Sequence, residues 1–265
     1  MTRIITGLLA AIGWLALLHS RSFSLFWLIV AGIGFLAARE YFTIILRPAE
    51  KFLHPSLLAL AMLPVIAAWW QSSATVYAVY TLSLAVICCA VVQRAARLTA
   101  PFDVLLKAVF GATYVGLFPA LVILIMAVPD GAEWLLVLTT ITAASDTGAY
   151  FTGKALGRHK LCPSISPGKT VEGFVGGLLA GTICSTMILL MVLPDVPLLR
   201  FIPVAVALTV TGVVGDLVES LLKRSMGVKD SGTILPGHGG VLDRADSLLL
   251  TAPLLFHLLS GNFFG

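Results

Sequence analysis

The sequence predicts an all-α, polytopic integral membrane protein with about nine transmembrane helices and a cytoplasmic N-terminus. Of its 265 residues, 58% are hydrophobic and only 11% are charged, whereas soluble domains are about 45–50% apolar and about 25% charged. The mean hydropathy of the chain is +1.01. Because no soluble domain of useful size remains outside the apolar runs, we expect those runs to form the fold itself.

Nine apolar segments approach the length of about 20 residues that a helix needs to cross a bilayer. The first segment follows Arg3 and lacks a clear small-residue cleavage site, so we expect a retained span rather than a signal peptide. Pro64 and Pro119 lie inside spans, where neighbouring helices can satisfy the freed backbone groups. The expected spans are 4–19, 24–46, 55–70, 75–93, 104–127, 133–151, 172–193, 201–222 and 247–263.

The distribution of positive charge predicts the orientation of these spans. Cytoplasmic loops carry an excess of lysine and arginine, and a cytoplasmic N-terminus places fifteen of the 17 Lys and Arg residues on that side. Only Arg21 and Arg200 fall outside. The charge-rich loops 152–171 and 223–246 are then cytoplasmic, and the C-terminus lies outside. The net charge of +4 follows from this topology and does not indicate binding to nucleic acid.

The four cysteines are expected to be free thiols. Cys88 and Cys89 are adjacent inside an apolar run, and neither they nor Cys162 and Cys184 form a CxxC or Cys/His metal spacing. We therefore expect no disulfide framework.

The densest group of charges is the segment Ser220–Asp246, which lies between two strongly apolar segments. It alternates cations and carboxylates around the pair Gly239 and Gly240. Such a pattern suits a site that holds phosphates through cations and a metal ion through carboxylates. A solvated loop is the alternative, but the charges continue upstream as one face of a helix that should lie in lipid.

That helical face consists of Asp216, Glu219, Ser220 and Lys223, whose spacing of i, i+3, i+4 and i+7 places them together. Two acids and a lysine facing lipid would cost several kcal/mol, so these side chains should face the protein interior or a wet cavity. An ion pair between Glu219 and Lys223 at the membrane edge is the simpler alternative. It does not explain Asp216, which lies one turn deeper.

Asp243 and Asp246 lie three residues apart just before the last span. They can share one face at the N-terminus of that helix, where negative charge is favourable, and simple N-capping would explain either one alone. Mg²⁺ typically binds through one or two carboxylates and substrate phosphates. We therefore predict Asp216, Asp243 and Asp246 as metal ligands, with Asp146 near the inner end of another span as a further candidate.

The His238-Gly239-Gly240 triplet is harder to interpret alone. Glycine permits backbone conformations and close approaches that are closed to other residues, so the pair could let a ligand approach the backbone. His238 could donate to a phosphate or have only a structural role.

A second polar block, 145–173, carries Asp146 and four cations. Ser166–Thr170 resembles the end of a P-loop, but that motif requires glycine where this chain has Pro163, and no apolar strand precedes it. Positive-inside topology alone explains some of the cations. We predict only Lys169 as a contact to phosphate.

Three glycines spaced by four residues, Gly173, Gly177 and Gly181, begin the span after this block. Small residues at this spacing are typical of tightly packed membrane helices. We predict that they form a packing face.

These blocks resemble the diagnostic pattern of the phosphatidate cytidylyltransferases, also called CDP-diacylglycerol synthases. The family pattern contains S-x-apolar-K-R, K-D and P-x-H-G-G-apolar-x-D-R-apolar-D, and Ala245 is a small residue at its last apolar position. The S-D-T-G-A-Y, S-P-G-K-T-x-E-G and G-D-L-x-E-S blocks are also similar, so the resemblance covers the chain from about residue 145 onward. The matching residues are Ser220, Lys223, Arg224, Lys229, Asp230, Pro236, His238, Gly239, Gly240, Asp243, Arg244 and Asp246.

The resemblance implies transfer of the cytidylyl group of CTP to phosphatidate, which gives CDP-diacylglycerol and pyrophosphate, with Mg²⁺ and a second, monovalent cation at the site. It also implies a homodimer. We expect a bacterial inner membrane protein whose partners are CTP, phosphatidate and membrane lipids, with no nucleic acid. The N-terminal helices, 1–130, are expected to provide a scaffold and lipid access, and residues 131–265 to carry the catalytic site.

A phosphate monoester is largely a dianion at neutral pH, so phosphatidate needs no general base and the main obstacle is charge repulsion. Cations held in place would neutralise the phosphates of both substrates. On this interpretation the catalytic residues are Lys223, Arg224, Lys229, Asp243, Arg244 and Asp246, and the substrate-binding residues are Lys169, Ser220, His238, Gly239 and Gly240.

Three other functions remain to be weighed against this one. The same site could activate a different lipid phosphate, because the headgroup chemistry would be identical. A secondary transporter could use the acids as ion sites, but these lie at one membrane edge and no internal repeat is evident. A CDP-alcohol phosphotransferase would need a D-G-x2-A-R block, which is absent.

Overall fold

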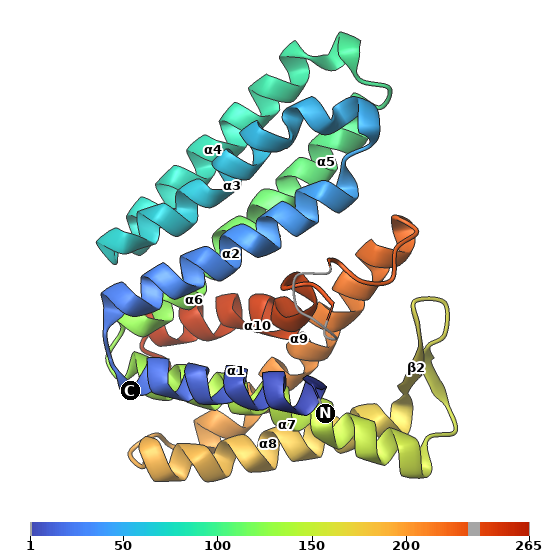
Figure 1. Cartoon of the computed structure of the whole chain (residues 1–265). Helices are drawn as coiled ribbons and strands as arrows, with labels where there is room; N and C mark the ends of the chain where they lie inside the picture. Colours follow the sequence, from blue (N-terminus) through green and yellow to red (C-terminus); the bar gives the residue numbers. More distant parts are fainter. Residues whose placement is uncertain (1, 233–238, 265) are drawn as a thin grey trace. The chain divides into compact units, whose positions relative to one another are not determined.

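The computed structural model describes residues 2–232 and 239–264 of the chain. Helices make up nearly all of the secondary structure, as Figure 1 shows, so the predicted all-α membrane fold is confirmed. Among the described residues, the only strands are a short antiparallel pair, β1 and β2, which the sequence did not predict.

The long helices follow one another along the chain with short connections. They are α1 (Thr2–His19), α2 (Phe23–Ile45), α3 (His54–Ala67), α4 (Ser73–Gln93), α5 (Pro101–Gly111), α6 (Phe118–Ala127), α7 (Gly131–Leu156), α8 (Val171–Val192), α9 (Leu198–Ser225) and α10 (Leu242–Ser260). The strands are β1 (Lys160–Cys162) and β2 (Ser166–Thr170). Short 3₁₀ helices η1 (Pro48–Leu53), η2 (Ala68–Trp70) and η3 (Ala95–Arg97) and a π-helical segment η4 (Ala112–Leu117) complete the described elements.

Each of the nine segments predicted to span a membrane lies on a helical stretch of the described chain. Within the described residues, six stretches are long and apolar enough to cross a bilayer. α1, α7 and α10 are not among them, so the exact number of spans stays a prediction. The six stretches are Phe23–Ile45, Pro48–Trp70, Ser73–Gln93, Pro101–Ala127, Val171–Val192 and Leu198–Ser225.

The chain divides into two units. Unit 1 contains Met1–Leu17, Arg21–Ala127 and Asp230–Arg244, and unit 2 contains Leu18–Ser20, Val128–Lys229 and Ala245–Gly265. The segment Asp230–Arg244 therefore belongs with the N-terminal helices, although it carries part of the predicted site.

In unit 1, close contacts join α2 to the helical stretch Pro101–Ala127. A Cβ atom at Gly111 would collide with the ring of Tyr41, whose hydroxyl donates to the carbonyl oxygen of Lys107 at 2.8 Å. The π-helical segment η4 ends just before Pro119. A π turn and a proline are two recognised causes of irregularity in a helix, and here they occur together.

In unit 2, glycines let α8 lie directly on α7, and Figure 1 shows the two helices side by side. A Cβ atom on Gly177 would lie 2.8 Å from the carbonyl oxygen of Ser145 and 3.1 Å from the Cβ atom of Ala149. A Cβ atom on Gly173 would lie 2.9 Å from the Ala149 carbonyl oxygen, and one on Gly181 would lie 3.2 Å from another α7 carbonyl oxygen. The predicted packing role of these three glycines is confirmed.

A glycine also sets the contact between α9 and the unit 2 part of α10. A Cβ atom on Gly215 would lie 2.8 Å from the carbonyl oxygen of Asp246 and 3.1 Å from the Cβ atom of Leu250. The backbone of Asp246 can therefore approach α9 only because residue 215 has no side chain. This approach places Asp246 next to Asp216, the residue after that glycine.

Gly177→Val should destabilise the protein, because the added side chain has no room between α8 and α7. Overpacking of this kind costs about 1–3 kcal/mol, which corresponds to a fall in Tm of roughly 2–10 °C for a chain of this size. Thermal unfolding in detergent measures the change. Gly32→Val in α2 is the matched control, since nothing lies within 4 Å of a Cβ atom there. Equal Tm values for the two variants would contradict the packing role.

Candidate functional site

A cavity of about 520 Å³ in unit 2 collects polar residues from three structural elements. α7 contributes Asp146, Tyr150 and Lys154, the β1–β2 hairpin contributes Ser166, Lys169 and Thr170, and α9 contributes Asp216. Much of the remaining lining is small or apolar: Ala149, Gly153, Leu161, Gly168, Gly173, Phe174 and Val213. Charged groups beside an apolar wall suit a ligand that has a charged head and an apolar body.

The hairpin that carries Lys169 is fixed at its base to the first turn of α8. Thr170 caps that helix, because its Oγ1 atom accepts a hydrogen bond from the Gly173 N–H at 3.1 Å. Glu172 accepts hydrogen bonds from two backbone N–H groups that precede β1, and its Oε1 atom lies 2.6 Å from Nδ1 of His159. These contacts hold both ends of the hairpin and so place Lys169.

Lys169 forms an ion pair with Asp216 inside the cavity. The distance from Lys169 Nζ to Asp216 Oδ2 is 2.6 Å, and the two side chains are 25% and 30% exposed. Ser220 donates to the other carboxylate oxygen of Asp216 at 3.4 Å. The structure thus brings together three residues that the sequence predicted for the site.

Asp246 lies in the same electrostatic environment. The carboxylates of Asp216 and Asp146 both act on it repulsively, and the ammonium group of Lys223 acts on it attractively. Three of the four predicted metal ligands are therefore neighbours within unit 2.

Lys223 also forms an ion pair with Glu219. The distance from Lys223 Nζ to Glu219 Oε2 is 2.5 Å, and the side chains are 14% and 1% exposed. The simpler alternative considered for this helical face is therefore present in the structure. Lys223 is also attracted to Asp246, so its ammonium group interacts with two carboxylates.

Helix α9 ends in a glycine cap directly after these charges. Gly227 has a φ of 71°, its N–H donates to the Arg224 carbonyl oxygen, and the Val228 N–H donates to the Lys223 carbonyl oxygen at 3.0 Å. This is a Schellman arrangement, for which a left-handed residue is required. Arg224 and Lys229 are exposed around this terminus and do not line the cavity.

The remaining predicted residues lie in unit 1, except His238, which lies outside the described residues. Gly239 has a φ of 82°, so a side chain there would be strained. Asp243 Oδ2 accepts hydrogen bonds from the Gly240 N–H at 2.7 Å and from the backbone N–H of residue 231 at 2.9 Å. Asp243 therefore holds a loop together, and Arg244 beside it is exposed.

Carboxylates are grouped in unit 2 without forming a complete ligand set. Within residues 2–232 and 239–264, no group of three or more His, Cys, Asp and Glu side chains is arranged to hold a metal ion. Asp146, Asp216 and Asp246 nevertheless offer the oxygen donors that hard cations prefer. Because Mg²⁺ usually takes only one or two carboxylates and completes its shell with phosphates and water, this donor set fits that ion.

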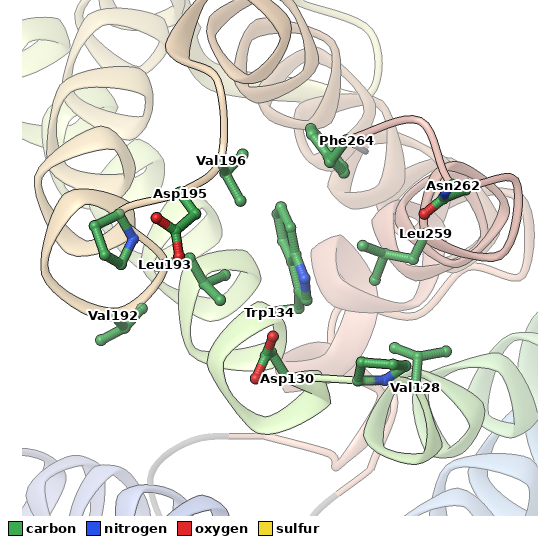
Figure 2. A pocket seen from close by; sticks show the side chains of 12 residues that line it. Val128, Asp130, Trp134, Val192, Leu193, Asp195, Val196, Leu259, Asn262 and Phe264 are labelled. Carbon is green, nitrogen blue, oxygen red and sulfur yellow. The ribbon is translucent and has the colours of Figure 1, made fainter.

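A second cavity in unit 2, of about 400 Å³, contains none of the predicted site residues. Figure 2 shows the side chain of Trp134 lying between Leu193 and Leu259. The rings of Trp134 and Phe264 stack with their centroids 4.6 Å apart. The lining of this second cavity includes two aspartates and no lysine or arginine, so the cavity does not suit a phosphate.

Sequence reasoning missed two carboxylates that organise the site. Glu172 fixes the hairpin that carries Lys169, and Glu40, buried in α2, holds the start of α10, the helix that carries Asp243. Glu40 could have been found from the sequence, because an acidic residue within an apolar span is a candidate functional residue. Tyr150 in the cavity was not predicted for the site, although it ends the S-D-T-G-A-Y block.

The fold and the site define an integral membrane protein with a cavity that pairs lysine with carboxylates. Residues 1–261 match the model of the Cytidylyltransferase family, and the chain belongs to that family. It is 47% identical to the phosphatidate cytidylyltransferase of Bacillus subtilis over 130 residues, which are 49% of this chain and 48% of the relative. It is 48% identical over 130 residues to the phosphatidate cytidylyltransferases of Staphylococcus saprophyticus and Staphylococcus aureus, again 49% of this chain and 50% of each relative. The match thus spans about half the length of these relatives.

Lys223→Met should destabilise the protein, because it leaves Glu219 buried beside an uncharged side chain. Breaking one side of a buried pair costs about 3–5 kcal/mol, whereas replacing both sides is often nearly neutral. The double variant Glu219→Gln with Lys223→Met should therefore recover most of the lost Tm in detergent.

Lys107→Met is the control for this experiment. Lys107 pairs with Asp103 at the same i,i+4 spacing, but Asp103 is 42% exposed, so the loss should be about 1 kcal/mol or less. If the double variant is as unstable as Lys223→Met, the lost stability does not come from the broken pair with Glu219.

Proposed function

We propose that this chain transfers the cytidylyl group of CTP to phosphatidate, giving CDP-diacylglycerol and pyrophosphate. The observation that carries the proposal is the Lys169–Asp216 ion pair inside a partly apolar cavity of a cytidylyltransferase-family chain. The relatives named phosphatidate cytidylyltransferase support the choice of substrates. A lysine suits a phosphate, a carboxylate suits a metal ion, and the apolar wall suits a lipid.

The reaction asks little covalent chemistry of the protein. An oxygen of the phosphatidate phosphate attacks the α-phosphorus of CTP, and pyrophosphate leaves with the electrons of the broken bond. A phosphate monoester has its second pKa at about 6, so the nucleophile is already largely a dianion at neutral pH. No side chain therefore has to remove a proton from the nucleophile, and the reaction needs no general base.

The work of the site is to reduce repulsion between the phosphates. Lys169 and Lys223 interact with the carboxylates of unit 2, and Lys154 lines the same cavity as Asp146 and Asp216. Arg224, Lys229 and Arg244 are exposed and would supply further positive charge to the triphosphate or to the lipid phosphate. The flexible stem of Lys169 allows its ammonium group to move from Asp216 to a phosphate oxygen.

Asp216 and Asp246, with Asp146 beside them, are the residues that would hold Mg²⁺. Such an ion supplies positive charge next to the reacting phosphates. Asp243 remains a proposed ligand on the strength of its sequence position, in addition to the loop contacts that its Oδ2 atom makes. The second, monovalent cation and the homodimer rest on the family resemblance alone.

We place the site at the cytoplasmic face of the bacterial inner membrane. The support is the charge distribution, because fifteen of the 17 Lys and Arg residues fall on one side of the predicted topology. CTP would then reach the site from the cytosol, and the lipid would enter from the bilayer.

Asp246→Asn should lower the turnover of purified protein by about 100-fold or more, the size expected for losing one preorganised charge in the site. The measurement uses phosphatidate, Mg²⁺ and α-labelled CTP in detergent and follows label into the organic phase. Lys51→Ala is the control and should leave turnover near wild type, because Lys51 is an exposed residue of η1, an element that carries none of the predicted site residues.

Full activity in Asp246→Asn would overturn the metal assignment, and a large loss in Lys51→Ala would show that the site is drawn too small. Label that enters another lipid phosphate but not phosphatidate would show that the protein activates that other lipid phosphate. No label with any lipid phosphate would reject the proposed function and return attention to ion transport.

Removing divalent ions with EDTA should abolish label transfer, and added Mg²⁺ should restore it. The reason is that EDTA removes the metal ion that the carboxylates of unit 2 would hold beside the phosphates. The free-Mg²⁺ concentration for half-maximal rate should be higher in Asp146→Asn than in wild type. Transfer that persists in EDTA would contradict the proposed metal.

A further inference from the structure

Glu40 accepts hydrogen bonds from Ser231, Val241 and Leu242, which lie about 200 residues later in the chain. It lies in α2, is only 5% exposed, and belongs to unit 1 together with Asp230–Arg244. Its Oε2 atom accepts from the Ser231 hydroxyl at 3.1 Å and from the Leu242 N–H at 3.0 Å. Its Oε1 atom accepts from the Val241 N–H at 3.1 Å.

Two of these donors belong to the start of a helix. α10 begins at Leu242, and the first N–H groups of a helix have no partner within it. A carboxylate at that end satisfies these groups and interacts favourably with the helix dipole. Glu40 therefore caps α10 from a helix some 200 residues earlier in the chain.

Glycines make room for this carboxylate. A Cβ atom on Gly232 would lie 2.7 Å from the Glu40 Cδ atom, and one on Gly240 would collide with both Ser231 Oγ and Glu40 Oε2. The second glycine of the His-Gly-Gly triplet thus has a concrete role: it leaves room for the contact between Ser231 and Glu40.

A second carboxylate ties the same loop from the other side. Asp243 Oδ2 accepts from the backbone N–H groups of Ser231 and Gly240. Glu40 and Asp243 together join Ser231 to Gly240 and to the first turn of α10. We refer to these contacts of Glu40, Ser231, Gly240 and Asp243 as the carboxylate clasp.

We propose that Glu40 is a positioning residue for the transfer reaction, acting through the carboxylate clasp to fix the first turn of α10. That turn carries Asp243 and Arg244, and Asp246 follows three residues after Asp243 in the same helix. This role rests on the proposed function, because it assumes that these residues serve the reaction. On this proposal Glu40 acts through the clasp and not by contact with a substrate.

Glu40→Gln is the sharpest test of this role. All three contacts donate to Glu40, and they use both of its oxygens. A glutamine keeps the size but turns one acceptor into an NH₂ donor that faces another donor. Turnover should fall by about 10- to 100-fold, the size expected from a misplaced catalytic group, with the KM for CTP little changed.

Glu50→Gln is the matched control. Glu50 is also a buried glutamate of unit 1, 1% exposed, and its Oε2 atom accepts from the Arg47 N–H at 3.0 Å. It lies in η1 and is not one of the residues of the clasp, so this variant should lose Tm but retain turnover per folded molecule. Ser231→Ala removes one of the three donors and should act in the same direction as Glu40→Gln, more weakly, should the latter fold poorly.

Hydrogen exchange measured by mass spectrometry tests the clasp without any assay of activity. Peptides that contain Val241 and Leu242 should exchange faster in Glu40→Gln than in wild type, and should exchange at the wild-type rate in Glu50→Gln. Faster exchange together with the selective loss of turnover supports the proposal.

Three results would overturn the positioning role. They are unchanged exchange in Glu40→Gln, full turnover despite faster exchange, or an equal loss of turnover in Glu50→Gln. If wild-type protein transfers no label to any lipid phosphate, the proposed function fails and the positioning role fails with it. The exchange experiment then still decides whether the clasp exists.

Discussion

Compensation of buried carboxylates is the constraint on which this structure depends. A chain with 58% hydrophobic residues offers few partners for a charge, and an unpaired carboxylate in such surroundings is costly. Glu40 accepts from a hydroxyl and two backbone N–H groups, and Glu219 Oε2 pairs with the ammonium group of Lys223. The Glu219–Lys223 pair lies within α9, whereas the bonds of Glu40 tie α2 to the start of α10.

Glycine provides the other half of this organisation, because it decides how closely two backbones approach. Gly177 allows α8 to lie on α7, and Gly215 allows the backbone of Asp246 to lie on α9. The second contact brings the carboxylate of Asp246 into the field of Asp216. The pair Gly215-Asp216 therefore supplies both the space for a neighbouring carboxylate and a carboxylate of its own.

The fold and much of the site could be predicted from the sequence because their signs are local. Apolar length predicts the helices, and the spacing of Asp216, Ser220 and Lys223 predicts a shared face. The β1–β2 hairpin was missed because its strands are too short to show alternation, and it depends on the capping contacts of Glu172. The bonds of Glu40 were missed because they join residues about 200 positions apart, a distance that no local pattern reports.

The carboxylates of this chain fall into two kinds, and the difference explains where function is concentrated. Glu40 and Glu172 accept hydrogen bonds from backbone N–H groups, so their charge is spent on holding segments together. Asp246, by contrast, is placed where Asp216 and Asp146 repel it. Lys223 offsets part of that repulsion, and Lys169, which pairs with Asp216, has a flexible stem that can turn to other anions. A group of like charges held together by glycine packing favours any added cation, and a cation so bound attracts phosphates in turn. The close approach at Gly215 thus holds Asp246 beside Asp216 although both are carboxylates, and this arrangement supports the proposed cation site.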